Sequence, residues 1–218
     1  MKRNEKTLLG VGSILLVTFV IWTLLIQAVD VRPVGQNATD IGFATFNCWF
    51  HELTGVHLSI YNLTDCLELL PLCICAFFGG LGFFQLIKGK SLSKVDQDIM
   101  ILGIYYLIVI MIFTFFEIIP VNYRPILIKG KLEASYPSST TMLVLCMMPT
   151  AMLQLHARIK NVFLKRCVIS VLAAFTFFMV IARLISGVHW FTDIIGGILL
   201  STGLVLMYHW LCICSKQT

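Results

Sequence analysis

Charged residues are scarce in this chain. Asp, Glu, Lys and Arg together make up 12% of its 218 residues, against the roughly 25% that is usual in soluble domains. Hydrophobic residues account for 58%, and the mean hydropathy is +0.90. This composition excludes a disordered chain, which needs low hydrophobicity and high charge, and it argues against a soluble domain. It favours an integral membrane protein.

Other absences narrow the class further. The net charge is +5, but no stretch is dense in Lys and Arg, so no nucleic-acid partner is expected. Runs that alternate apolar and polar residues are absent, which excludes a membrane β-barrel. Among the eight cysteines, the two C-x-C pairs at 73–75 and 212–214 lack the C-x-x-C spacing of metal or redox sites. We interpret these cysteines as small apolar side chains and expect no bound metal.

Six apolar stretches are close to the roughly 20 residues that a membrane-spanning helix needs. They lie at about 8–28, 62–87, 99–120, 138–156, 165–185 and 190–214. They predict an all-α fold, a six-transmembrane-helix bundle, with residues 1–218 forming a single integral membrane domain. The first stretch follows basic residues, as in a signal peptide, but it is longer than the apolar segment of about 7–15 residues in such a peptide. We therefore interpret it as a span.

The positions of the basic residues predict the orientation. Eleven of the sixteen Lys and Arg residues lie near the termini and in the loops after the second and fourth stretches, and five lie on the other side. Because short cytoplasmic loops carry an excess of positive charge, we expect both termini in the cytoplasm and the protein in the plasma membrane. The first loop, about residues 29–61, then faces outward and has room for a short surface-lying helix. Arg124 and Arg183 also lie on the outer side, either as interfacial anchors or as parts of a site.

A hydroxyl-rich segment, YPSSTT, spans the start of the fourth stretch. Pro137 is well suited to start a helix. Ser138, Ser139 and Thr140 then place hydroxyl groups and free backbone N–H groups in the first turn. Such a helix end carries partial positive charge and binds phosphate. The alternative is that Ser138 only caps the helix.

A histidine and an aspartate stand four residues apart in the segment ARLISGVHWFTDIIGG. On one helix, His189 and Asp193 would share a face and form a hydrogen bond. A carboxylate that holds one ring nitrogen leaves the other nitrogen free to attack or to accept a proton. Gly187 allows a sharp turn that brings Arg183 close to His189. The alternative is a structural pair that caps a span.

The chain contains three short motifs in this order: Arg124-Pro125, Pro137-Ser138 and Arg183-x5-His189-x3-Asp193. Together they resemble the type 2 phosphatidic acid phosphatase superfamily of membrane lipid phosphatases. That family is recognised by K-x6-R-P, then P-S-G-H, then S-R-x5-H-x3-D. The last motif is the most specific. The motifs cover about residues 117–193, and the six-span pattern extends the resemblance to the whole chain.

The resemblance implies a role for each candidate residue. His189 is expected to be the nucleophile that forms a phosphohistidine, and Asp193 is expected to orient it and balance its charge. The residues expected to hold the phosphate are Arg124, Ser138, Ser139, Thr140 and Arg183. No metal and no cofactor is expected, because arginines and helix-end amides stabilise the phosphoryl oxygens.

Four positions depart from the family motifs: Glu117 replaces lysine, Ser139 replaces glycine, Thr140 replaces histidine and Ala182 replaces serine. The missing histidine normally protonates the leaving oxygen, and its loss costs roughly 10²–10⁴-fold where acid assistance is needed. A diphosphate depends less on such assistance, because it expels a phosphate monoester rather than an alcohol. We therefore expect a lipid phosphatase that acts at the outer membrane face on a lipid phosphate or diphosphate, such as a polyprenyl diphosphate.

Two other functions stay open. One is a catalytically impaired relative that binds a lipid phosphate head group without efficient turnover, which the lost histidine and lysine favour. The other is a transporter or channel, because Asp65 and Glu68 lie in or near the second span, although no inverted repeat is visible. For an enzyme, the candidates for the missing acid are Glu133, Glu117, His51 and His57.

Overall fold

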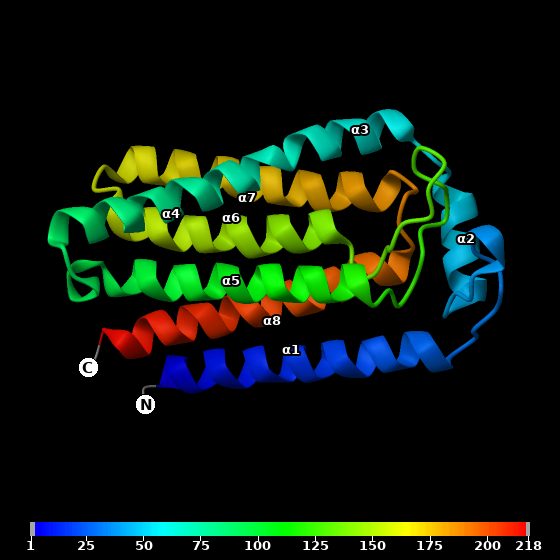
Figure 1. The fold of residues 1–218 in the computed structure, drawn as a ribbon, viewed down its shortest axis with the longest axis horizontal. Helices are drawn as coiled ribbons and strands as arrows, with labels where there is room; N and C mark the ends of the chain where they lie inside the picture. The colour runs from blue at the N-terminus through cyan, green and yellow to red at the C-terminus, as the bar shows by residue number, and fades with distance from the viewer. Residues whose placement is uncertain (1–2, 217–218) are drawn as a thin grey trace.

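Six long helical segments run side by side along the molecule (Figure 1). The computed structural model describes residues 3–216. The long segments are α1 (Arg3–Ala28), α3 (Leu58–Leu67) continued by α4 (Leu69–Gly89), α5 (Gln97–Ile118), α6 (Ser139–Arg158), α7 (Val162–Ile185) and α8 (Phe191–Ser215). The loops contain the short helix α2 (Ala44–Thr54) and the 3₁₀ turns η1 (Gln36–Ala38) and η2 (Leu92–Lys94). The predicted fold class, an all-α six-transmembrane-helix bundle, is confirmed.

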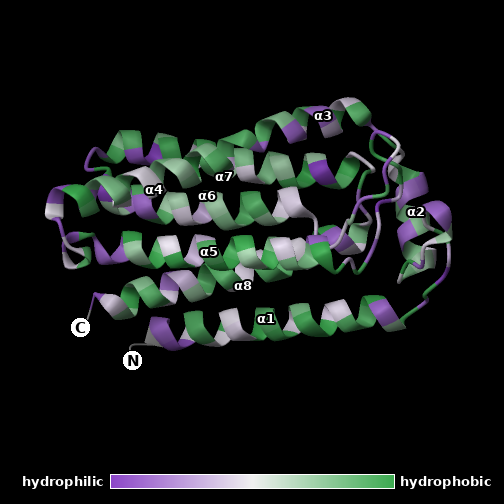
Figure 2. Cartoon of the chain, in the orientation of Figure 1, coloured by the Kyte–Doolittle hydropathy of each residue, from purple (hydrophilic) through white to green (hydrophobic). Residues whose placement is uncertain are grey.

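Each of the six segments is long and apolar enough to cross a membrane, and each overlaps one of the predicted stretches. Figure 2 shows hydrophobic residues along most of the helix lengths and hydrophilic residues mainly near the two ends of the bundle. The protein is therefore an integral membrane protein. That residues 1–218 form a single domain stays a prediction.

The second segment, Leu58–Gly89, is the longest at 32 residues. It is divided at Glu68, which ends α3 and precedes α4. Pro71 lies in the first turn of α4 and has no N–H to bond to the carbonyl oxygen of Leu67. The proline accounts for the break in the helix.

The helix α6 lies at the centre of the bundle. It contacts α4, α5, α7 and α8, whereas α1 packs chiefly against α8. Its most apolar 18-residue stretch has a mean hydropathy of 1.3, the lowest of the six segments, against 1.7–2.6 for the others. A lower hydropathy is tolerated here because the polar side chains of α6 face other helices rather than lipid. Pro149 lies inside α6 without ending it, as expected where neighbouring helices support an interrupted turn.

The two chain ends lie at one end of the bundle, and the loops after α1, α5 and α7 lie at the other (Figure 1). The short helix expected in the first loop is present there as α2. Gly187 forms the predicted sharp turn with a φ of 71°, and a β-carbon at this position would come within 2.1 Å of the carbonyl oxygen of Gly55. Only glycine fits this turn. Asn47 of α2 donates to the Thr192 hydroxyl at 3.0 Å, which ties the loop to α8.

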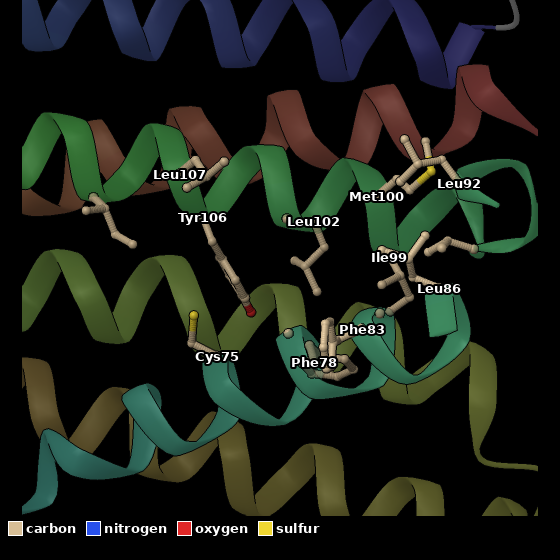
Figure 3. Close-up of a pocket in the computed structure, with 15 residues that line it drawn as sticks. Cys75, Phe78, Phe83, Leu86, Leu92, Ile99, Met100, Leu102, Tyr106 and Leu107 are labelled. Carbon is tan, nitrogen blue, oxygen red and sulfur yellow. The ribbon is translucent and has the colours of Figure 1, made fainter. Parts of the chain in front are cut away.

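An apolar cavity of about 440 Å³ lies between α4 and α5. Figure 3 shows Leu102 and Tyr106 of α5 projecting toward Cys75 and Phe78 of α4. The cavity lies along the parts of these helices that are nearer the chain ends. None of the predicted site residues lines it, so it is separate from the polar cluster described next.

Candidate active site

His189 lies in the short connection between α7 and α8, two residues before the first residue of α8. Its side chain is buried, with 1% of its surface exposed. The Nδ1 atom lies 3.1 Å from the carbonyl oxygen of Ser135. Because a carbonyl oxygen only accepts, Nδ1 carries the proton and donates it. The Nε2 atom therefore keeps its lone pair, and it has no hydrogen-bond partner among residues 3–216.

The surroundings of His189 keep its ring neutral. Burial is the main cause that lowers its pKa well below the usual value near 6.5, and the positive charges of Arg124 and Arg183 lower this pKa further. A neutral imidazole with a free Nε2 is the form that a nucleophile or a general base needs.

Asp193 is buried in the first turn of α8. The predicted hydrogen bond to His189 is not formed, because Asp193 Oδ2 lies 3.8 Å from Nδ1. Oδ2 instead accepts from the backbone N–H of Trp190 at 2.9 Å, and Oδ1 accepts from Asn122 Nδ2 at 3.2 Å. The physical reason is that His189 precedes the helix, so a spacing of four does not place both residues on one helical face. Asp193 therefore caps α8 and also lies close enough to balance a charge on the imidazole.

Arg124 and Arg183 come from different elements and meet at the ring of Tyr61 in α3. The guanidinium carbon lies 4.9 Å from the ring centroid for Arg183 and 6.0 Å for Arg124. Arg183 also donates from Nη1 to Thr64 Oγ1 at 2.9 Å, and Arg124 Nε lies 3.2 Å from Glu133 Oε2. Arg124 is only 7% exposed and Arg183 only 1% exposed, so neither is an interfacial anchor.

Several buried donors in this region have no hydrogen-bond partner within the part of the chain that the structure describes. They are Arg124 Nη1, Arg183 Nε, Ser135 Oγ, Ser138 Oγ and Thr141 Oγ1. Buried polar groups in proteins are nearly always paired, so each exception needs an explanation. Two arginines with unpaired donors, together with three unpaired hydroxyl groups at the same end of the bundle, are suited to an anion with several oxygens, such as phosphate.

The hydroxyl-rich segment forms the start of α6. Ser138 precedes the helix, but its hydroxyl makes no capping bond, so the interpretation as a simple cap is not supported. Its backbone N–H donates to the carbonyl oxygen of Asp193 at 3.2 Å, which places it beside α8. Ser139 is the first helical residue and is half-buried. Thr140 is buried, and its hydroxyl donates to Glu68 Oε2 at 2.6 Å.

None of the four candidates for the missing acid bonds to the Thr140 hydroxyl, whose partner is Glu68. His51 and His57 are held by backbone carbonyl oxygens of the loops at this end of the bundle. Glu133 pairs with Arg124, and Glu117 is exposed near the end of α5. The carboxylate that bonds to the Thr140 hydroxyl belongs to Glu68. The sequence indicated this residue only as an acidic side chain in or near the second span.

Sequence reasoning did not assign five residues of this cluster to the site: Tyr61, Thr64, Glu68, Asn122 and Ser135. Tyr61 and Thr64 share one face of α3, and Glu68, the residue that follows this helix, continues the same spacing of three and four residues. Polar residues at this spacing within an apolar span are a signal that could have found them. The contact from Ser135 uses its backbone carbonyl, which every residue carries, so no sequence signal points to it.

Comparisons with known proteins identify a matching family and a similar fold. The model of the PAP2 superfamily matches residues 113–213, a range that includes all of the predicted site residues. The fold is similar to the crystal structure of a transmembrane PAP2-type phosphatidylglycerolphosphate phosphatase from Bacillus subtilis. The TM-score is 0.61, with 17% sequence identity, over 95% of this chain and 97% of that chain. No curated protein matches the chain.

Proposed function

The chain belongs to the PAP2 superfamily, and on this premise we propose that it is a membrane lipid phosphatase. It hydrolyses a phosphoric ester or anhydride through a phosphohistidine on His189. The observation that carries the proposal is the free Nε2 of this buried residue beside the unpaired donors of Arg124 and Arg183. The imidazole provides a nucleophile for phosphorus, and the guanidinium groups bind the phosphoryl oxygens.

The geometry supports a two-step reaction. Nε2 of His189 attacks phosphorus, and the bond to the leaving oxygen breaks. The ring then carries a positive charge, which Asp193 Oδ2 balances from 3.8 Å, while the carbonyl of Ser135 holds Nδ1. Arg124 and Arg183 stabilise the negative oxygens of the transferring group. Water then attacks the phosphohistidine, releases inorganic phosphate and restores the neutral imidazole.

The proposed substrate is a lipid diphosphate, such as a polyprenyl diphosphate. A site at one end of a membrane-spanning bundle suits a phosphate head group whose tail lies in the bilayer. The similar Bacillus subtilis protein is a phosphatidylglycerolphosphate phosphatase, which supports a lipid phosphate as the substrate class. Thr140 stands where the family has its acid histidine, and a diphosphate needs the least acid assistance. Lys and Arg are in excess at the end of the bundle that holds both termini and the loops after the second and fourth spans. This excess supports cytoplasmic termini and a site at the outer face of the plasma membrane.

Phosphate release by the purified protein in detergent tests the proposal, with a polyprenyl diphosphate and a phosphatidic acid offered side by side. His189→Asn is expected to reduce release by roughly 10⁶-fold, as removal of the nucleophile does in a serine protease. His209→Asn is the matched control, because His209 lies on α8 near its opposite end. An alkali-stable, acid-labile phosphate label on the wild-type protein, absent from His189→Asn, identifies the intermediate. Full activity of His189→Asn contradicts the proposal.

The alternative is a relative that binds a lipid phosphate head group without efficient turnover. The replacement of the acid histidine by Thr140 and of the lysine by Glu117 favours it. Binding of a lipid phosphate that depends on Arg183, with no phosphate release and no label on His189, would select this alternative over the enzyme.

A further inference from the structure

We propose that Glu68 is the proton source for the leaving group, acting through the hydroxyl of Thr140, and that this pair replaces the acid histidine of the family motif. The proposal rests on the proposed phosphatase function and adds to it the means of protonating a poor leaving group. It assigns a role to a residue outside all three sequence motifs.

The contact between the two side chains carries the proposal. Thr140 Oγ1 donates to Glu68 Oε2 at 2.6 Å, a length typical of a hydroxyl bonded to a carboxylate. Thr140 is fully buried, whereas Glu68 is half-buried. A threonine hydroxyl alone is a very weak acid. When Glu68 carries a proton, the direction of this hydrogen bond reverses: the carboxyl O–H donates to Thr140 Oγ1, and the threonine hydroxyl is free to donate its own proton to another oxygen.

The position of Glu68 in the fold connects it to the site. It lies at the break between α3 and α4, within the second membrane segment. Ionisable residues inside such segments are costly and are usually functional. Tyr61 and Thr64, on the same face of α3, contact Arg183 at 4.9 Å and 2.9 Å. Glu68 also interacts electrostatically with Arg183, so this face of α3 forms one wall of the phosphate site.

The proton balance is complete without another reactant. The form of the protein that reacts holds Glu68 as a neutral carboxyl group. In the first step, the bond from His189 Nε2 to phosphorus forms, and the bond to the leaving alcohol oxygen breaks. The Thr140 hydroxyl gives its proton to that oxygen and takes the proton of the Glu68 carboxyl group, which becomes a carboxylate. In the second step, water attacks phosphorus, and its proton returns through Thr140 to Glu68. The alcohol and inorganic phosphate leave, and every protein group regains its starting form.

Two substrates with the same tail test the proposal. A polyprenyl monophosphate releases an alcohol and needs an acid, whereas the polyprenyl diphosphate releases a phosphate monoester and needs much less help. Glu68→Gln is expected to lower kcat/KM for the monophosphate by roughly 10²–10⁴-fold and to leave diphosphate hydrolysis close to the wild-type rate. Retained diphosphate hydrolysis also shows that the variant is folded. Thr140→Val is expected to lower kcat/KM for both substrates, and by a larger factor for the monophosphate.

A rescue variant and a matched control complete the experiment. Thr140→His combined with Glu68→Gln is expected to restore monophosphate hydrolysis, because it places the family's acid at its usual position. Asp65→Asn removes a neighbouring exposed carboxylate on α3 and is expected to change neither activity.

The outcomes separate the two proposals. An equal loss on both substrates in Glu68→Gln, no loss on the monophosphate, or a wild-type protein that cleaves only the diphosphate would each overturn the role of Glu68 and leave the phosphatase proposal standing. A wild-type protein that releases phosphate from neither substrate and forms no phosphohistidine overturns the proposed function itself.

Discussion

Each end of the bundle contains an arginine that contacts side chains of other elements, but the partners of the two arginines differ. Near the chain ends, Arg158 donates to Asp98 at 3.1 and 3.2 Å and to Asp96 at 3.3 Å, and it also bonds to Gln154. At the other end, Arg183 donates to the Thr64 hydroxyl, and its Nε has no partner among the described residues.

This difference distinguishes a structural arginine from a binding one. The charge of Arg158 is matched by two carboxylates within the protein, so the network is complete in itself. Arg183 is more deeply buried and has fewer acceptors, so its charge is left for an anionic ligand. Unmatched donors therefore indicate function more directly than burial does.

Replacement of each arginine by methionine gives the largest contrast between the two ends. Arg183→Met is expected to lower kcat/KM by about 10²–10³-fold, as loss of one preorganised donor to a charged transition state does. Its thermal stability in detergent is expected to change little, because an apolar side chain of similar length replaces an incompletely paired charge. Arg158→Met is expected to keep its activity but to lose about 1–3 kcal/mol of stability, since Asp98 is left without its cation. Phosphate release and thermal unfolding measure both effects, and equal activity losses would contradict the distinction.

The pH dependence of activity sharpens the same comparison. Burial, Arg124 and Arg183 lower the pKa of His189 below 6.5. The nucleophile therefore stays unprotonated through neutral pH, and kcat/KM for the diphosphate is expected to fall only at a pH below the usual histidine range. In Arg183→Met, one positive neighbour is removed, so this pKa rises and the acid limb moves to higher pH. Arg158→Met is expected to leave the limb in place. A limb that stays fixed in Arg183→Met would show that the titrating group is not His189.

The starts of two helices provide the smallest contrast. Asn161 caps α7, with its side-chain oxygen accepting from the backbone N–H of Leu164 at 3.0 Å, whereas Ser138 makes no such bond at α6. Asn161→Ala is expected to cost about 1 kcal/mol of stability and no activity. Ser138→Ala is expected to cost little stability and to lower kcat/KM by about five- to tenfold, because one hydroxyl donor to the phosphate is lost. A stability loss as large as that of Asn161→Ala would restore the capping interpretation.

The helices were largely predictable because membrane spans depend on local composition. The predicted stretches at 138–156 and 190–214 are found as α6 (Ser139–Arg158) and α8 (Phe191–Ser215). The second span begins at Leu58, close to the expected start at about 62. Within its first turns, Tyr61 and Thr64 contact Arg183.

The candidate site was predictable only in part. The motif spacings indicated His189, Asp193 and the two arginines. The same spacing gave a wrong expectation for the hydrogen bond between His189 and Asp193, because it assumed that both lie on one helix. The carbonyl that holds Nδ1 comes from Ser135, 54 residues away in the chain, and a backbone group carries no sequence signal.

By itself, the sequence determined that this chain forms six apolar helices able to cross a membrane, since helices satisfy their own backbone hydrogen bonds where no water is present. Only the tertiary structure decided which polar groups surround His189. The contact between Thr140 and Glu68 joins residues 72 positions apart. It depends on the rotation of each helix about its axis and on the break before Pro71, and both are set by packing between helices rather than by the composition of any one span.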